Sequence, residues 1–409
     1  MYRSNIKLNN VVRNAGMFVL VLSLAFASIA AISPIAAKSP SVSEIAMANY
    51  RDAQSSNLSE EDKIKSAISA YFTTRYESQR LLESQDFSPV LENATLEWVR
   101  KEMDKREIEL YIATLFGLRY LSYNYTLDYD SIKITSYKAV VHLRESHNVV
   151  FETSAPVVSK LGNLPHIITL RKKHAMWTIV IDQYQDEGTI ALDNQTKQEL
   201  LAQVDENYKL NQQLTSTHRE EAVSSAFYPS PSLKSYSYNR TEAVDYADDF
   251  WNTKNPPYYK GLDSDCANFV SQALYAGEGK KPPDKSGMTT SPTRKINTDW
   301  YYVWKNSGSK PWINVPAQYT FITKNINKIG PYGQGTTSFC NTQIGDIVQL
   351  YSYSRGWFHE GIITLIVNPC GGLQFYYANA HTTNRQHYLL AYWAQYKMRF
   401  IKINGWRGK

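Results

Sequence analysis

The chain has 409 residues, 43% of them hydrophobic and 20% charged, a composition that excludes a collagen-like or wholly disordered chain and leaves room for two ordinary domains. Its net charge of +6 falls to +3 without residues 1–37, which carry three basic side chains and no acidic ones. So weak a balance, with no nucleic-acid-binding motif beside it, excludes nucleic acid as the expected partner.

Residues 1–37 have the organisation of a secretory signal peptide. Arg3, Lys7 and Arg13 precede the apolar run "AGMFVLVLSLAFASIAAI", and small residues follow near Ala37. The apolar run is also about long enough to span a bilayer, so an uncleaved anchor remains an alternative. In both cases we expect the rest of the chain to be exported, with membrane attachment only if the signal is uncleaved.

Residues 38–190 predict an α+β domain. Ser59 can cap a helix with Asp62 three residues later, and a second helical region covers about 91–116. From about 117 the pattern becomes strand-like, as in "SIKITSYKAVVHLR" and "HAMWTIVIDQYQDE", and predicts an antiparallel meander. The pattern is similar to a cystatin- or NTF-type cone, in which helix packs on a curved antiparallel sheet. Its histidines lack metal-ligand spacing, so we expect no metal site here.

A polar segment, 191–236, with one expected helix and a Pro/Ser-rich end, predicts a linker before a second domain at 237–409. That domain opens with a short amphipathic helix and continues with a helix that begins near Cys266 and stops at Gly277. Strands are expected at 345–353, 359–367, 373–382 and 397–403.

Cys266 lies in the first turn of its expected helix. Peptide dipoles and unpaired N–H groups at a helix start favour an anion and lower a thiol pKa. The adjacent Asp265 opposes thiolate formation, so a nucleophilic Cys266 needs a base. The alternative is a structural or disulfide-bonded cysteine.

His359 is the candidate base, because it begins the second strand of an expected hairpin. The next strand carries Tyr377, Asn379 and His381 on one face by alternation, so either His381 or Asn379 can orient the imidazole of His359. Each histidine taken alone is as well explained by a structural or solvated role. The order of cysteine helix, histidine strand and polar strand favours the catalytic interpretation.

The other two cysteines frame the same hairpin. If Gln349 opposes Ile363, then Cys340 and Cys370 lie nearly opposite each other beyond its open end, and we expect a disulfide between them. Cys266 is then the odd cysteine of an exported protein, which favours a used thiol.

Several blocks of the second domain resemble a known family. They are "DCANFVSQALYAG", "WYYVWKNSGSKPWINV", "IGDIVQLYSYSRGWFHEGIIT" and "YANAHTTN". They resemble, over about 237–405, the "Putative amidase domain" family of exported Gram-positive proteins, which is grouped with CHAP amidases and NlpC-type peptidases of papain-like fold. The resemblance implies catalytic roles for Cys266 and His359, with His381 as the third polar position. The family often has Gly-Gly-Asp-Cys-Thr where this chain has Asp-Ser-Asp-Cys-Ala.

These observations predict a secreted cysteine amidohydrolase or endopeptidase that needs no cofactor and acts in the cell wall of a Gram-positive bacterium. The expected substrate is peptidoglycan or a peptide, with Asp265, Trp357 and Tyr377 as substrate-binding candidates. Two alternatives remain: an acyl transferase that cross-links through the same thiol, and a non-catalytic cell-wall or protein-binding module. No oligomeric state follows from the sequence.

Overall fold

A computed structural model describes residues 40–93, 96–193, 195–217, 233–253, 262, 264–279, 295–302 and 308–408. The expected signal peptide and most of the Pro/Ser-rich end of the expected linker lie outside these ranges. Residues Ser41–Lys409 form one compact unit. Within the described ranges, none of the helices combines the length and apolar character that crossing a bilayer requires.

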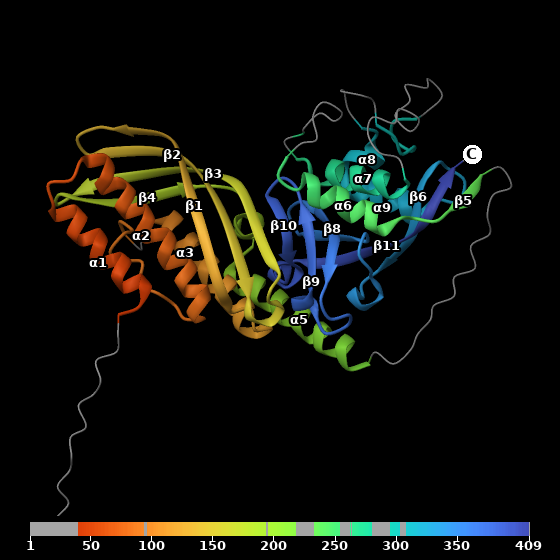
Figure 1. Ribbon diagram of the computed structural model, residues 1–409, viewed down its shortest axis with the longest axis horizontal. Helices are drawn as coiled ribbons and strands as arrows, with labels where there is room; N and C mark the ends of the chain where they lie inside the picture. Colours follow the sequence, from red (N-terminus) through yellow and green to blue (C-terminus); the bar gives the residue numbers. More distant parts are fainter. Residues whose placement is uncertain are drawn as a thin grey trace, which may run out of the picture. The chain divides into compact units, whose positions relative to one another are not determined.

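The first half of the chain is three helices followed by an antiparallel meander (Figure 1). The meander and the last two of these helices were predicted from the sequence, and the first helix was not. Its elements are α1 (Val42–Ser55), α2 (Glu60–Leu81), α3 (Glu97–Phe116), β1 (Tyr120–Ile134), β2 (Lys138–Phe151), β3 (Val158–Lys173) and β4 (Met176–Gln183). The predicted cap of α2 is confirmed, since the Ser59 side chain accepts a hydrogen bond from the Asp62 N–H. Tyr71 and Phe72 of α2 pack with Trp177 of β4 in a core between helices and sheet.

The second half adds six helices and seven strands within the described residues. The helices are α4 (Glu187–Leu192), α5 (Lys197–Thr217), α6 (Arg240–Phe250), α7 (Cys266–Gly277), α8 (Lys310–Ile313) and α9 (Val315–Lys324). The strands are β5 (Lys234–Tyr236), β6 (Gly330–Thr336), β7 (Ile347–Ser352), β8 (Gly356–Ile366), β9 (Tyr376–Ala380), β10 (Asn384–Leu389) and β11 (Lys397–Gly408). All four strands predicted here are present, and the α+β class is confirmed.

Both halves share one hydrogen-bonded sheet. Its order is β1-β2-β3-β10-β9-β8-β7-β11-β5, with β4 on β3 and β6 on β11. The halves join where β10 pairs antiparallel with β3, for example Arg385 opposite Leu161. Strand β10, which begins at the last residue of the quoted block "YANAHTTN", therefore contacts the first half of the chain directly.

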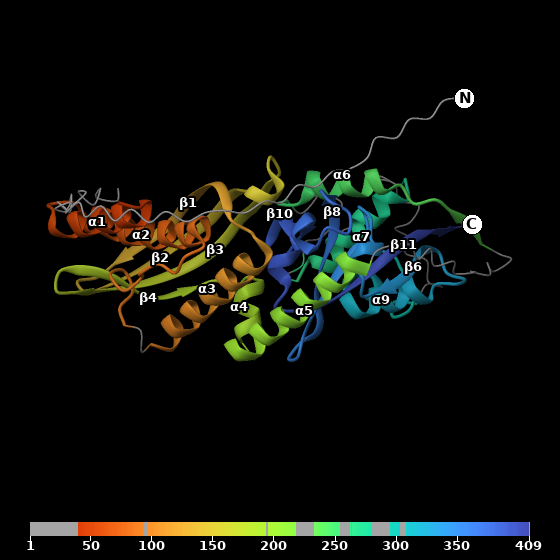
Figure 2. The same cartoon turned by 90° about the horizontal axis from the view of Figure 1, so that it is seen from below.

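Helices cover both faces of the strands β7, β8 and β9. One core contains residues of α6, α7 and α9 together with Ile347 and Ile362. The other contains residues of α3 and α5 together with Leu350 and Ile363. Figure 2 shows α6 above and α5 below these strands. Because side chains alternate along a strand, each residue of β8 belongs to one face or the other, and this decides which of them can reach Cys266.

Candidate functional site

Cys266 opens α7, with Asp265 as the residue before its first turn. Its side chain is buried, 2% exposed, in a small cluster with Ala267, Val315 and the partly buried Trp357. The thiol Sγ lies 3.9 Å from the carbonyl oxygen of Phe358, on strand β8. The helix start is thus placed directly over the beginning of β8, and the predicted substrate contact Trp357 lies beside the thiol.

The environment of the Cys266 thiol acts on its pKa in two directions. Burial, with the negative charge of Glu360, raises the pKa to about 12. The backbone N–H groups of Glu360 and Ala267 act in the opposite direction, because they donate to the sulfur. The resting thiol is therefore protonated at neutral pH, and its activation requires a group that accepts the proton.

His359 does not supply that group in this structure. In the β7–β8 ladder Leu350 opposes His359, and both side chains face the core that contains α5. The imidazole Nε2 lies 3.5 Å from Glu187 Oε1, and the ring contacts Trp393 edge-on at 5.6 Å between centroids. The predicted pair of Cys266 and His359 is thus separated by the sheet.

The reason lies in the register of the hairpin. The expected partner of Gln349 was Ile363, whereas the structure pairs Gln349 with Glu360. A shift by an odd number of residues moves every side chain of a strand to the other face. Burial lowers the pKa of His359 on its actual face, where Glu187 acts in the opposite direction.

Glu360 is the titratable residue of β8 on the face of Cys266, and it is not among the site residues predicted from the sequence. Its buried carboxylate accepts a hydrogen bond from Gln349 Nε2 at 2.5 Å. With its amide turned to suit both neighbours, Gln318 of α9 donates to Glu360 Oε1 at 2.9 Å. Burial raises the pKa of Glu360 to about 8, although the hydrogen bond from Gln349 and the charge of Arg399 lower it. Glu360 could have been predicted as a neighbour of Cys266 from the correct register of the β7–β8 hairpin.

His381 lies at the start of α7 rather than beside His359. Its Nδ1 is 2.8 Å from Asp265 Oδ2 and its Nε2 is 2.7 Å from the Phe250 carbonyl oxygen. Its ring stacks on Phe269 at 4.0 Å between centroids. Asp265 also accepts a hydrogen bond from Asn268, so this predicted substrate contact is engaged within the protein. The pair of Asp265 and His381 fixes the position of the residue before Cys266.

Asn379 and Tyr377 have structural positions instead of the predicted roles. Asn379 is fully buried, accepts a hydrogen bond from Thr364 Oγ1 at 3.0 Å and donates to the Ala247 carbonyl. It therefore connects β9 with β8 and α6 and does not orient His359. Tyr377 is also fully buried, and its hydroxyl bonds to Ser154. Burial raises the pKa of Tyr377 to about 12, and the side chain is not available to a substrate.

Cys340 and Cys370 lie together, as predicted, but form no disulfide. All three cysteines are free thiols, and Cys370 Sγ lies 3.6 Å from the carbonyl oxygen of Cys340. Burial, with the neighbouring Cys370, raises the pKa of Cys340. Cys266 is therefore not set apart as the one unpaired cysteine of this structure, and the predicted disulfide is wrong. Within the described ranges, no group of three or more His, Cys, Asp and Glu side chains could hold a metal ion.

Comparisons with known proteins bear on the same segment. The family model described as "Putative amidase domain" matches residues 237–403, which contain Cys266, Glu360 and His381. This part of the chain is therefore similar to an amidase domain, and hydrolysis of amide bonds is the reaction class that the match indicates.

Two individual proteins are similar over smaller parts. "Uncharacterized protein YhbB" of Bacillus subtilis (strain 168) is 48% identical over 44 residues, which are 11% of this chain and 14% of that protein. The chain thus matches only a small part of that relative's length. The crystal structure of the Kfla4162 protein from Kribbella flavida is aligned over 32% of this chain and 97% of its own, with 10% identity and a TM-score of 0.23.

Proposed function

We propose that the protein is a cysteine-dependent amide hydrolase in which Cys266 is the nucleophile and Glu360 its proton acceptor. The observation that carries the proposal is the position of the thiol. Within the segment similar to an amidase domain, Sγ lies at the first turn of α7 against the backbone of Phe358 and Glu360. A carboxyl group with a pKa of about 8 is suited to exchange a proton near neutral pH.

The proposed reaction has two stages. Cys266 Sγ attacks the amide carbon while the ionised Glu360 takes the thiol proton, and N–H groups of the first turn of α7 stabilise the oxyanion. The carbon–nitrogen bond breaks as Glu360 gives its proton to the leaving amine. Water then hydrolyses the thioester, which releases a carboxylic acid and restores the thiol.

The substrate is proposed to reach the thiol past Trp357, the partly buried member of the Cys266 cluster. The guanidinium of Arg399 lies 3.8 Å above the Trp357 ring and 3.5 Å from that of Tyr319. Its Nε donates to Gln349, the residue that also bonds Glu360. A cation stacked between two aromatic rings suits a polar, peptide-like substrate better than an apolar one.

Peptidoglycan stem peptides, or the amide bond to muramic acid, are the proposed substrate. Two observations support this proposal: the signal peptide expected from the sequence, from which export is proposed, and the resemblance to exported amidase domains. A thiol that transfers the acyl group to an amine instead of water would use the same first stage, so product analysis must separate hydrolysis from transfer.

The test compares three variants of residues 38–409 by the amines they release from peptidoglycan. We expect Cys266→Ala to abolish release and Glu360→Gln to lower it by about 10²–10⁴-fold, the range for loss of a general acid–base group. His359→Gln, changed on the opposite face, is the control and should keep most of the activity. If Glu360→Gln retains activity while His359→Gln loses it, the acceptor is the histidine predicted from the sequence.

A further inference from the structure

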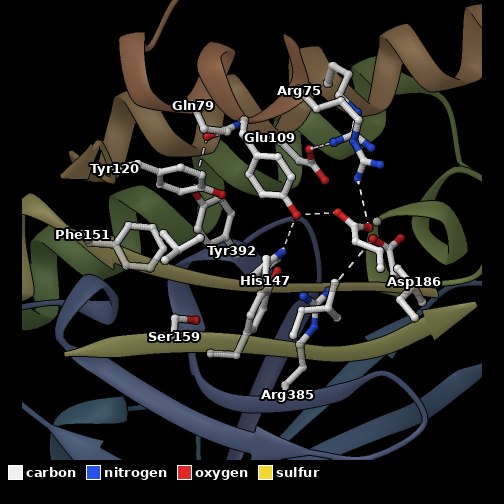
Figure 3. Close-up of a pocket in the computed structure, with 18 of the residues that line it drawn as sticks. Arg75, Gln79, Glu109, Tyr120, His147, Phe151, Ser159, Asp186, Arg385 and Tyr392 are labelled. Atoms are coloured by element: carbon white, nitrogen blue, oxygen red, sulfur yellow. Dashed lines mark hydrogen bonds and ion pairs between the residues drawn. The ribbon is translucent and has the colours of Figure 1, made fainter. Parts of the chain in front are cut away.

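A second candidate site lies where the two halves of the chain join, between α2, the strands β2 and β3, strand β10 and the turn before α4 (Figure 3). It is a cavity of about 80 Å³, room for more than a single water molecule. Charged side chains of both signs line it, together with the aromatic residues Tyr76, Tyr120, Phe151, Tyr388 and Tyr392. It contains none of the residues proposed for amide hydrolysis.

The carboxylates of this cavity have partners within the protein. Glu145 accepts hydrogen bonds from Tyr76 and from His166 Nε2 at 3.1 Å. Asp186 accepts from Lys105 Nζ at 2.7 Å and from the Thr189 N–H at 2.8 Å. A third acidic residue, Glu109, accepts from Arg106 at 2.8 Å. The acidic groups therefore need no further cation.

Unlike these carboxylates, not all the guanidinium groups of the cavity have hydrogen-bond partners within the protein. Arg106 uses all three nitrogens, on Glu102, Glu109 and Tyr184. In Arg75, by contrast, Nε and Nη1 are buried without a hydrogen-bond partner among the described residues, and Nη2 lies 3.8 Å from Glu145. The Arg75 side chain is only 9% exposed.

Arg385 of β10 repeats this pattern. Its Nη2 donates to Glu187 at 2.9 Å and lies 4.0 Å from Asp186 Oδ2, while its Nε is buried without a hydrogen-bond partner among the described residues. Its side chain is 7% exposed. Both guanidinium groups act on the pKa of His147, which burial lowers to about 3, so both lie near this neutral imidazole. Figure 3 shows Arg75 and Arg385 approaching the cavity from opposite sides, with His147 to one side of them.

Buried charged donors are costly to leave without acceptors, and folded proteins rarely do so without a use for them. Arginine N–H groups without partners, beside carboxylates that have theirs, can bind one anionic group. The aromatic residues that line the cavity can pack against an apolar part of the same ligand. We propose that this cavity binds a small organic monocarboxylate, whose oxygens accept hydrogen bonds from Arg75 and Arg385. The site is separate from the hydrolase proposal and does not rest on it.

The test uses benzoate and benzamide, which have the same shape but differ in charge. Isothermal titration of residues 38–409 should give saturable binding of benzoate and at least about tenfold weaker binding of benzamide, because hydrogen bonds to ions are the stronger ones. Arg75→Gln should weaken benzoate binding by a similar factor. The control is Arg80→Gln, the same change on the same helix at an arginine that pairs with Glu77 outside the cavity.

Each result of these titrations either supports or overturns the proposed carboxylate site. Selective benzoate binding by the unaltered protein, lost in Arg75→Gln and kept in Arg80→Gln, supports the site. Equal binding of both compounds, no saturable binding of benzoate, or binding unchanged in Arg75→Gln overturns it. If Arg75→Gln does not fold, Arg75→Lys keeps the charge but loses the planar fork, and unchanged benzoate affinity in that variant also refutes the geometry.

Discussion

Replacement of Glu360 by glutamine should change how the stability of the protein depends on pH. The pKa of Glu360 is about 8 in the folded chain and close to 4.5 in the unfolded chain. Between these values the folded protein holds a proton that the unfolded chain releases, so this residue lowers stability as pH rises. From pH 5 to pH 8 the loss of unfolding free energy is about 3 kcal/mol. Glutamine has the same shape and cannot ionise, so the variant should not show this loss.

The assay is urea unfolding of residues 38–409 at pH 5 and pH 8, for the unaltered protein and Glu360→Gln. Other titrating groups, among them His166, with a raised pKa of about 9, act in both proteins and cancel in the difference. The control is Glu61→Gln, an exposed carboxylate of α2, which should follow the unaltered protein. Equal pH dependence in the Glu360→Gln and unaltered proteins would refute the assignment of a raised pKa, and with it the proposed proton acceptor.

Three further outcomes are expected. His166→Gln should destabilise the protein by about 3–5 kcal/mol at pH 7 in urea unfolding, because it removes a buried charge that bridges Asp182 and Glu145; a loss below 1 kcal/mol would contradict this bridge. Asn379→Ala should cost about 2–4 kcal/mol in the same assay, since it leaves several buried groups without partners, and near-neutral behaviour would show that they find other partners. Cys266 should react with iodoacetamide more slowly at pH 7 than a model thiol, as its raised pKa requires; fast alkylation, followed by mass spectrometry, would indicate a preformed thiolate.

The class of the fold could be predicted because its signals are local. The cap at Ser59 and the long alternating runs identify helices and strands without knowledge of their neighbours. The first helix was missed because its buried face includes the polar residues Ser43 and Gln54, which weaken the apolar pattern of a helix. A capping box of Ser41 and Glu44 nevertheless marks its start. Strand β6 was missed because its Gly-rich sequence, "GPYGQGT", lacks the side chains that signal a strand.

The candidate site could be predicted only in part, because it depends on register. Cys266 and its helix start follow from local pattern. The closeness of Cys340 to Cys370 follows from the hairpin itself, because both cysteines lie beyond its open end in either register. Which of His359 and Glu360 faces the thiol depends on a pairing offset that a bulged hairpin does not reveal in sequence. The proposed anion site could not be predicted for the same reason, since Arg75 and Arg385 line one cavity only because β3 pairs with β10.

The proposed function requires that Cys266 breaks an amide bond. The most direct measurement is mass spectrometry of soluble fragments that residues 38–409 release from purified Gram-positive peptidoglycan, beside the Cys266→Ala protein. This function predicts fragments that carry a new amine and a new carboxylate and that are absent with Cys266→Ala. The masses of these fragments identify the bond. Equal fragments from both proteins, or none from either, would contradict it.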